Sequence, residues 1–420
     1  MSTTQGFAGL LRHPGFAQLW AASGLSIFGT FVSSLAFQLL MIDGLKANQF
    51  EIGLVRSAQW LPSLLLGLVA GVIADRLYRK SLLIGADIVS GMLMLAVAAL
   101  ALTGNLSIGL LAAFAFLLGC VAVLYGGAFQ ALTADLLPPA LLTAGNVLQT
   151  QTYTAAATTG PMISGVLVRL IGAPLAIAVD GLSYLASAVL LWRLPGIKQE
   201  RSAASVPILT SLRDGFAWVY RHRTLAPYAL TLHAWFIGNN IASVVYVYHG
   251  TALGLGSVAV GVTLACAGIT GVLGATLAQP VSKRLGLGMV VVWAHVLTGA
   301  AWVLVALVPP GGLAFAALCV AQLIYGLGLG IEDPLSMSYR NAVTPSRLRG
   351  RMNTTIRSFN WGLIAVAAPL GGWLALTFGD AAALITGGAI MIASGALLVL
   401  SPYRAAVMPE APDGASIAEG

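Results

Sequence analysis

Three carboxylates lie inside long apolar stretches of the sequence: Asp180, Glu332 and Asp333. An ionised side chain costs about 2.5 to 3.5 kcal/mol at the centre of a lipid bilayer, so an acid kept there faces protein or water. Glu332 and Asp333 are adjacent, so they cannot point the same way from a helix, and their like charges repel. We predict that these three acids take up and release protons. The alternative is structural pairing, for instance with Arg340 or Arg357.

No group of residues has the spacing of an enzyme or metal site. The five histidines have no nucleophile or ligand partner at motif spacing, and each of the three cysteines lies in an apolar run, where a thiol behaves as a small apolar side chain. These residues are His13, His222, His233, His249, His295, Cys120, Cys266 and Cys319. We therefore predict no enzymatic activity, no cofactor and no bound metal.

One stretch combines spaced glycines, an acid and three cations where an apolar run ends. It reads Gly67-Leu-Val-Ala-Gly71-Val-Ile-Ala-Asp75-Arg76-Leu-Tyr-Arg79-Lys80. The glycines let a second helix approach closely in lipid, the acid needs an arginine or the free N–H groups of another helix, and the cations favour the cytoplasmic leaflet. We expect a charge network at the cytoplasmic ends of the spans, with Asp75 facing the start of the eleventh span; for the cations alone, the alternative is a simple stop signal of positive charge. Its predicted members are Gly71, Asp75, Arg76, Arg79, Lys80, Asp87, Asp135, Arg351 and Arg357.

Polar side chains inside other apolar stretches are candidates for lining a cavity, and the alternative is that they bridge helices by hydrogen bonds. They are Gln38, Gln130, Tyr153, Asn239, Asn240, Tyr325 and Asn360. Arg56 lies near the outer end of the second apolar stretch. It could bind an anion, but we expect it to extend to the outer membrane interface instead.

The composition excludes a soluble protein. Of the 420 residues, 58% are hydrophobic and 8% are charged, whereas roughly a quarter of residues are charged in soluble domains. The net charge of +7 does not indicate nucleic-acid binding, because the cations fall in short loops between apolar runs. About 20 apolar residues cross a bilayer as a helix. We predict twelve membrane-spanning helices at residues 16–41, 51–74, 81–103, 107–135, 143–171, 173–194, 224–249, 258–280, 287–308, 312–339, 350–378 and 380–402.

The cations also predict the topology and the domain boundaries. Nearly all of them fall on one side of the predicted spans, which places both termini in the cytoplasm. The long polar connection contains an amphipathic segment that we expect to lie on the inner leaflet as a helix. The predicted units are an N-terminal six-helix bundle (1–195), a linker with the interfacial helix (196–223), a C-terminal six-helix bundle (224–403) and a disordered cytoplasmic tail (404–420).

The two halves of the sequence match each other. The stretch 67–80 aligns with 271–284, where Gln279 replaces the acid and Lys283 and Arg284 keep the charge. Gly160-Pro161 in the fifth span likewise corresponds to Ala368-Pro369 in the eleventh. Internal repeats of this kind are typical of transporter folds.

These motifs resemble the major facilitator superfamily, in particular the branch with macrolide efflux pumps and the enterobactin exporter. The resemblance spans nearly the whole chain, including residues 10–20, 67–80, 82–87, 178–187 and 344–351. It implies an all-α integral membrane protein in which twelve transmembrane helices form two pseudo-symmetric six-helix bundles. It also implies that 67–80 is a gate latch and that the charge network around it closes an inner gate. Gly160, Pro161 and Gly165 would form an antiporter motif, and Asp180 in relatives pins the sixth helix.

The sequence departs from the family pattern at two places. The antiporter motif has Ala156 and Ser164 where glycines are usual, and the first span has Gly29-Thr30 where many relatives carry an acid after the glycine. The small residues preserve close packing, whereas the missing acid argues against a proton site in the first span.

The expected function is proton-coupled export of a small amphipathic molecule, such as a drug or a siderophore-like metabolite, by alternating access. The alternatives are a proton-coupled uptake symporter for a nutrient and a membrane sensor or scaffold. We expect a monomer in the bacterial inner membrane, whose partners are the substrate, protons and lipid, without nucleic acid.

Overall fold

The computed structural model describes residues 9–11, 13–67, 77–195 and 208–408, and in these ranges the chain is helical without a strand. The first half of the chain forms α2 (Phe16–Leu39), continued by the π-helix η1 (Leu40–Gly44), α3 (Gln49–Leu66), α5 (Arg79–Leu102), α6 (Ile108–Leu136), α7 (Pro139–Ile171) and α8 (Ala173–Trp192). The helix α9 (Ile208–Arg221) follows. The second half forms α10 (Leu225–Ala252), α11 (Ser257–Leu285), α12 (Leu287–Ala306), α13 (Ala314–Val343), α14 (Ser346–Phe378), α15 (Asp380–Val399) and the short 3-10 helix η2 (Pro402–Ala405).

The twelve-helix architecture predicted from the sequence is confirmed. Ten of the helices in the described ranges are long and apolar enough to cross a membrane. The other two of the twelve, α3 and α10, carry polar side chains such as Arg56, Asn239 and Asn240. Both helices pack against the opposite half of the chain, so these polar groups need not face lipid. Two helices begin a full turn earlier than predicted: α7 starts at Pro139 and α14 at Ser346. Each begins directly after an N-cap proline, Pro138 or Pro345, because a proline at the start of a helix leaves no intrahelical hydrogen bond unmade.

The two halves pack as structural repeats. In the first half α2 contacts α7 and α8, α5 contacts α8, and α3 contacts α6. In the second half the corresponding pairs are α10 with α14 and α15, α12 with α15, and α11 with α13. A Cβ at Gly91 would lie 2.9 Å from the carbonyl oxygen of Gly181, and one at Gly299 would lie 2.6 Å from that of Gly388. Equivalent glycines therefore allow α5–α8 and α12–α15 to pack closely, as small residues do in lipid.

The turns between spans repeat as well. Gly172 joins α7 to α8 with φ of 83°, and Gly379 joins α14 to α15 with φ of 90°. Only glycine adopts this backbone conformation freely. A single glycine therefore ends one span and begins the next at both places.

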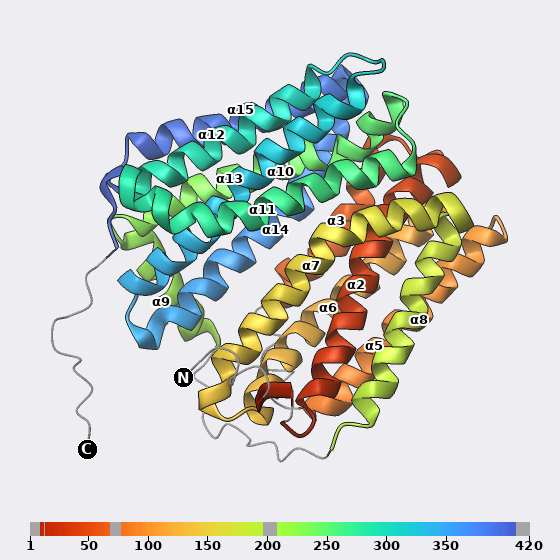
Figure 1. The fold of residues 1–420 in the computed structure, drawn as a ribbon, viewed down its shortest axis with the longest axis horizontal. Helices are drawn as coiled ribbons and strands as arrows, with labels where there is room; N and C mark the ends of the chain where they lie inside the picture. The colour runs from red at the N-terminus through yellow and green to blue at the C-terminus, as the bar shows by residue number, and fades with distance from the viewer. Residues whose placement is uncertain (1–8, 12, 68–76, 196–207, 409–420) are drawn as a thin grey trace.

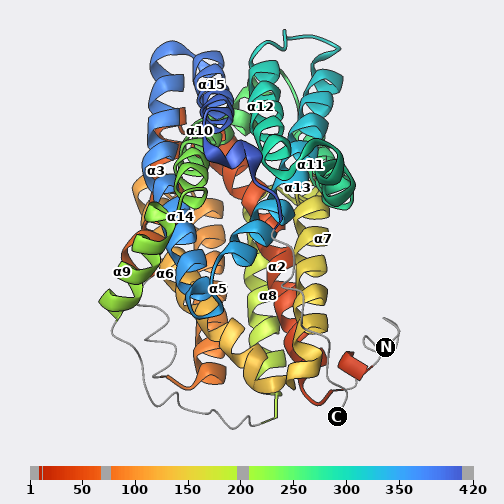
Figure 2. The ribbon, with the colours of Figure 1, turned by 90° about the vertical axis from the view of Figure 1, so that its left-hand side faces the viewer.

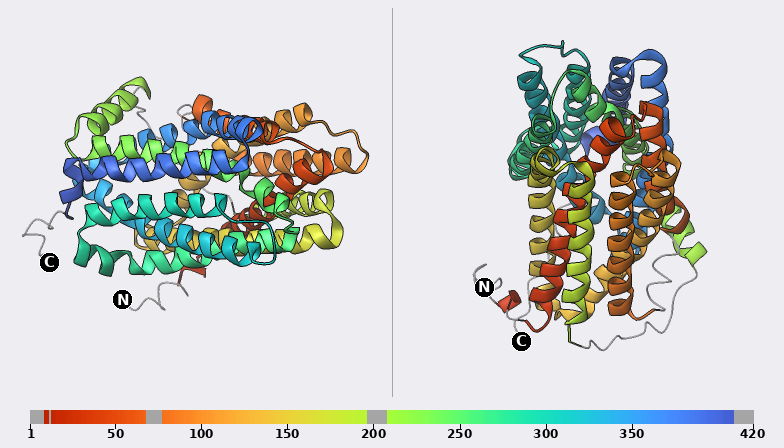
Figure 3. Two further views of the ribbon diagram at one scale, coloured as in Figure 1. Left: turned by 90° about the horizontal axis from the view of Figure 1, so that it is seen from above. Right: turned by 90° about the vertical axis from the view of Figure 1, so that its right-hand side faces the viewer.

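Two seams join the halves, and they are related by the same repeat. One is formed by α3 against α14, and the other by α7 against α11. Figure 1 shows that the bundles meet at one end, which we call the closed end, and diverge toward the end that carries α9, which we call the α9 end. Two further views show each bundle as a set of roughly parallel helices (Figure 3).

The helix α9 belongs to the second half by its contacts. It packs along α14 and α10 (Figure 2), and Gly215 lies so close to α14 that a Cβ would be 2.6 Å from Thr355 Oγ1. Val219 is fully buried. At the other boundary, Tyr403 of η2 is fully buried, so packed structure extends to the start of the segment predicted as a tail, and residues 409–420 lie outside the described ranges.

Candidate functional site

In the first seam, one face of α3 contacts α14 along its length. A Cβ at Gly53 would lie 2.5 Å from the carbonyl oxygen of Ala368, and Trp60 packs edge-on against Trp361 with ring centroids 5.6 Å apart. The Ser57 hydroxyl donates to the carbonyl of Ala365 at 2.5 Å. Because proline has no N–H, Pro369 leaves that carbonyl without its helical donor. Ser57 thus supplies across the seam the hydrogen bond that α14 lacks.

The second seam contains the predicted antiporter motif. A Cβ at Gly165 would lie 2.4 Å from the carbonyl oxygen of Ser257, and a Cβ at Gly261 would lie 2.4 Å from that of Pro161. The Ser257 hydroxyl donates to the Gly165 carbonyl at 2.9 Å. Gly160 instead lies against Phe31 of α2. The motif therefore sits where α7 crosses α11, and the buried Ala156 and Ser164 keep the helix surface small there.

Polar contacts join the halves at the closed end. Gln49 of α3 donates to Asp380 Oδ1 of α15 at 2.9 Å, and His249 Nδ1 of α10 lies 3.6 Å from Asp380 Oδ2. Asp380 thus links both halves at this end.

A polar cluster lies between the halves further along the first seam. Arg56 Nη2 of α3 donates to Asn240 Oδ1 of α10 at 3.3 Å, and the Asn240 amide donates to the Phe236 carbonyl at 2.8 Å, which orients its oxygen toward Arg56. Asn239 Oδ1 accepts from Tyr325 at 2.9 Å and from Trp302 at 3.2 Å. The predicted cavity residues Asn239, Asn240 and Tyr325 are therefore brought together.

The expectation that Arg56 extends to the outer interface is wrong. Its Nε is buried without a hydrogen-bond partner, and its guanidinium turns to the opposite half. Arg56 lies one helical turn from both Gly53 and Trp60. Because these two residues face α14, the Arg56 side chain also points toward the second half.

Glu332 lies in a buried hydrogen-bonded chain within the second half. Its Oε1 is 3.0 Å from His295 Nε2, and His295 Nδ1 is 2.9 Å from Ser394 Oγ. Ser394 donates its only hydroxyl proton to the Met391 carbonyl at 2.6 Å, so His295 Nδ1 must be the donor to Ser394. A hydrogen bond between His295 Nε2 and Glu332 then requires one further proton on this pair, because an imidazole lone pair cannot donate to a carboxylate. Sequence reasoning missed His295 because 37 residues separate it from Glu332.

The other two predicted proton carriers lie in different surroundings. Asp333 is exposed and lies within electrostatic range of Tyr153, the predicted cavity residue of α7, which is 56% exposed. Asp180 is fully buried and accepts from Ser33 at 2.5 Å and from Ser183 at 3.2 Å. Within the described ranges none of the three acids forms an ion pair with an arginine.

Asp180 also explains a glycine in the first span. A Cβ at Gly29 would lie 2.2 Å from Asp180 Oδ1, so the space beside Gly29 is filled by the carboxylate from α8. The adjacent Thr30 bonds to Tyr184 of α8 at 2.9 Å. Asp180 therefore joins α2 to α8.

The predicted gate residues do not form one network within the described part of the chain. Gly71, Asp75 and Arg76 lie outside it. Arg79 pairs with Asp135, and Lys80 donates to the Trp192 and Leu194 carbonyls. These contacts stay within the first half, so they do not by themselves hold the two halves together.

Three further predicted gate residues point elsewhere. Asp87 is fully buried and bonds to Ser187 of α8 at 2.6 Å, which places it inside the first half. Arg351 pairs with Asp214 of α9 at 2.5 Å. Arg357 lies over the ring of Trp361, 5.2 Å from its centroid.

The remaining cavity candidates have separate environments. Gln38 donates to the Ser34 carbonyl at 3.5 Å, and Gln130 is exposed on α6. Asn360 is buried, with Oδ1 2.6 Å from His233 Nδ1, and Tyr220 of α9 lies 2.6 Å from His233 Nε2. Burial raises the pKa of Tyr220 to about 12, so its hydroxyl stays protonated and can donate to the neutral imidazole. Asn360 thus anchors α9 through His233.

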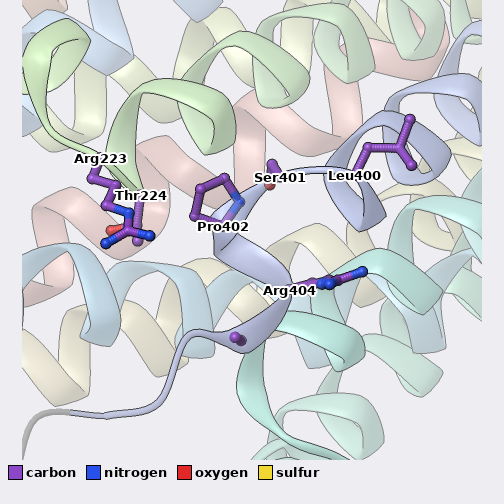
Figure 4. Close-up of a pocket in the computed structure, with 7 residues that line it drawn as sticks. Arg223, Thr224, Leu400, Ser401, Pro402 and Arg404 are labelled. Carbon is purple, nitrogen blue, oxygen red and sulfur yellow. The ribbon is translucent and has the colours of Figure 1, made fainter.

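Two pockets lie at the ends of the bundles. One, of about 590 Å³, lies at the α9 end between the start of α10 and η2 and includes Arg223 and Arg404. The Arg404 side chain extends away from Arg223 (Figure 4), so the two do not form a joint anion site. The other, of about 560 Å³, lies beside Ser257 and Arg169 at the closed end.

Comparisons with known proteins cover nearly the whole chain. A family model described as transmembrane secretion effector matches residues 4–413. The multidrug efflux pump Tap of Mycobacterium tuberculosis is 28% identical over 397 residues, which is 89% of this chain and 88% of that protein. The uncharacterized MFS-type transporter YkuC of Bacillus subtilis is 24% identical over 226 residues, or 52% of each chain.

Solved structures share the fold at low sequence identity. The nucleoside transporter NupG has a TM-score of 0.69 and 14% identity, with 91% of this chain and 97% of that one covered. A bacterial homologue of the iron transporter ferroportin in an inward-facing state has a TM-score of 0.71 and 17% identity, covering 93% and 98%.

Proposed function

Because this chain belongs to the transmembrane secretion effector family of the major facilitator superfamily, we propose that it is a proton-coupled exporter of small amphipathic molecules that works by alternating access. The observation that carries the proposal is the similarity to the multidrug efflux pump Tap along 89% of the chain. The antiporter motif at the α7–α11 crossing agrees with this direction of transport.

The proposed transport cycle follows from the two seams. We place the α9 end in the cytoplasm, where the cations of the short loops favour it. The substrate enters from this end, where the bundles diverge (Figure 1). Transport to the other side then requires the glycine contacts at the closed end to open and the α9 end to close, as rigid bundles rock about a central site.

We propose that the His295–Glu332 pair carries the coupled proton. With the proton present, the 3.0 Å contact is a hydrogen bond. Without it, a carboxylate oxygen and an imidazole lone pair repel each other at that distance, so proton loss favours a rearrangement of α12 against α13. We propose Asp333, the exposed neighbour of Glu332 in the sequence, as the second acid that takes up and releases a proton.

Inside-out membrane vesicles with an acidic lumen test this proposal. They should accumulate at least one probe from a panel of ethidium (cationic), Nile red (neutral) and 8-anilinonaphthalene-1-sulfonate (anionic), and Glu332→Gln should abolish the accumulation. Glu51→Gln is a matched control, because the Glu51 carboxylate closes the capping box of α3 with Asn48, a role that Gln can also fill. Loss of preloaded probe under the same gradient would indicate uptake instead, and no gradient-driven movement of any probe would contradict the proposal.

A further inference from the structure

Arg56 is a charged group between the two halves that lacks a counter-charge. Its guanidinium donates to a neutral amide, that of Asn240, and its Nε is buried without a partner. In the described ranges no carboxylate pairs with it, since the ion pairs there involve other cations. Charges inside membrane proteins are costly unless they are paired or used in binding, so the free donors of Arg56 require an explanation.

Two tryptophan rings and a second arginine follow Arg56 along the first seam, toward the α9 end. Trp60 lies one turn along the same face of α3, and it packs edge-on against Trp361 of α14. Arg357 lies over the ring of Trp361, one turn closer to the α9 end of α14. Trp361 is 37% exposed. Along the seam the order is therefore a cation, two indole rings and a second cation.

We propose that Arg56, Trp60 and Trp361 form a binding site for aromatic organic anions, in which a carboxylate, sulfonate or phosphate group accepts from the Arg56 guanidinium and a flat ring contacts the two indoles. The guanidinium presents a planar set of donors that matches such groups with two parallel hydrogen bonds. Indole rings bind flat apolar surfaces well. This inference rests on the proposed transport function and narrows its substrate class.

Binding at this site also affects the contact between the halves. An anion that accepts from the Arg56 fork competes with the Asn240 oxygen, and that hydrogen bond joins α3 of the first half to α10 of the second. Occupancy of the site is therefore linked to the loss of one contact across the seam, which is a way for a substrate to favour movement of the bundles.

Calorimetric titration of the purified full-length protein tests the site with two probes that share a ring system: 2-naphthalenesulfonate and the neutral 2-naphthalenemethanol. Arg56→Gln should weaken sulfonate binding by roughly 10- to 100-fold, since hydrogen bonds to charged groups contribute strongly, and should leave the neutral probe within about twofold. Arg169→Gln is the matched control, because Arg169 is exposed at the closed end and its removal should change neither affinity.

Arg56→Lys serves as a second variant if Arg56→Gln does not fold. It keeps the charge but not the planar fork, so sulfonate affinity should fall by roughly 3- to 10-fold, with the neutral probe unchanged. Unchanged sulfonate affinity in the folded variants, or equal loss for both probes, would overturn the site. The two proposals can fail separately. If the wild type binds 2-naphthalenesulfonate no more tightly than 2-naphthalenemethanol, but Arg56→Gln vesicles still accumulate ethidium or Nile red, the anion site is wrong and the proposed export function is kept. If the wild type prefers the sulfonate but no probe moves under the gradient, the anion site is kept and the proposed export function is wrong.

Discussion

Replacing Gly261 by alanine should shift the protein away from the conformation with the closed end closed. A Cβ at Gly261 would lie 2.4 Å from the Pro161 carbonyl oxygen, whereas ordinary contact begins at 3.4 Å. The backbone cannot turn aside as a flexible side chain can, so α7 and α11 must separate by about 1 Å where they cross. Overpacking of this kind costs about 1 to 3 kcal/mol, which corresponds to a shift of about 5- to 150-fold in the ratio of the two conformations.

Electron paramagnetic resonance distance measurements can detect this shift. Spin labels at Asn105→Cys and Pro310→Cys, both exposed in loops at the closed end, report the separation of the halves once Cys120, Cys266 and Cys319 are replaced. We expect a longer distance to become the main population in Gly261→Ala. Gly126→Ala is the matched control, because a Cβ there meets no atom within 4 Å. Equal distance distributions in both variants would refute the account of this seam.

Three further predictions concern contacts at both ends and in the core. Asp380→Ala should open the closed end more than Asp380→Asn does, because an amide oxygen still accepts from Gln49, and the same distance measurement checks the order. Asp180→Ala should lower the thermal unfolding temperature by several degrees, because about 1 to 3 kcal/mol of unfolding free energy is lost with its hydrogen bonds. Asp180→Asn should retain gradient-driven probe flux if the residue holds α2 to α8. Abolished flux in folded Asp180→Asn would indicate proton transfer instead. A double-mutant cycle on Arg351→Gln and Asp214→Asn should give a coupling below about 1 kcal/mol, because both side chains are partly exposed, and a larger coupling would contradict this assignment.

The helical architecture follows from local properties of the sequence, so it could be predicted. Span length, loop charge and the repeat of the Gly160-Pro161 position in Ala368-Pro369 depend on neighbouring residues or on internal comparison. The structure places both proline positions at the two seams, and one of them, Pro369, creates the free carbonyl that Ser57 fills. The helix starts at Pro139 and Ser346 were missed because hydropathy marks the lipid boundary and not the end of the helix.

The partners of the charged residues could not be predicted in the same way. Gln49 meets Asp380 across 331 residues and Arg56 meets Asn240 across 184. Which acid faces which helix depends on the rotation of each span, and a shift of one residue turns a side chain by about 100°. For that reason the sequence predicts Asp87 at the gate, although its side chain turns inward to Ser187, and it predicts Arg56 at the outer membrane interface.

The most direct test of proton-coupled export measures protons and substrate together. Inside-out vesicles with an acidic lumen and a trapped pH-sensitive dye are given a transported probe at zero time. For one-to-one exchange, each pH unit of gradient supports about tenfold accumulation, and every molecule that enters removes one proton. If export is coupled to protons through Glu332, the probe speeds alkalinisation of the lumen in the wild type and in Glu51→Gln, and has no effect in Glu332→Gln. Entry of the probe with an unchanged rate of proton loss would contradict it.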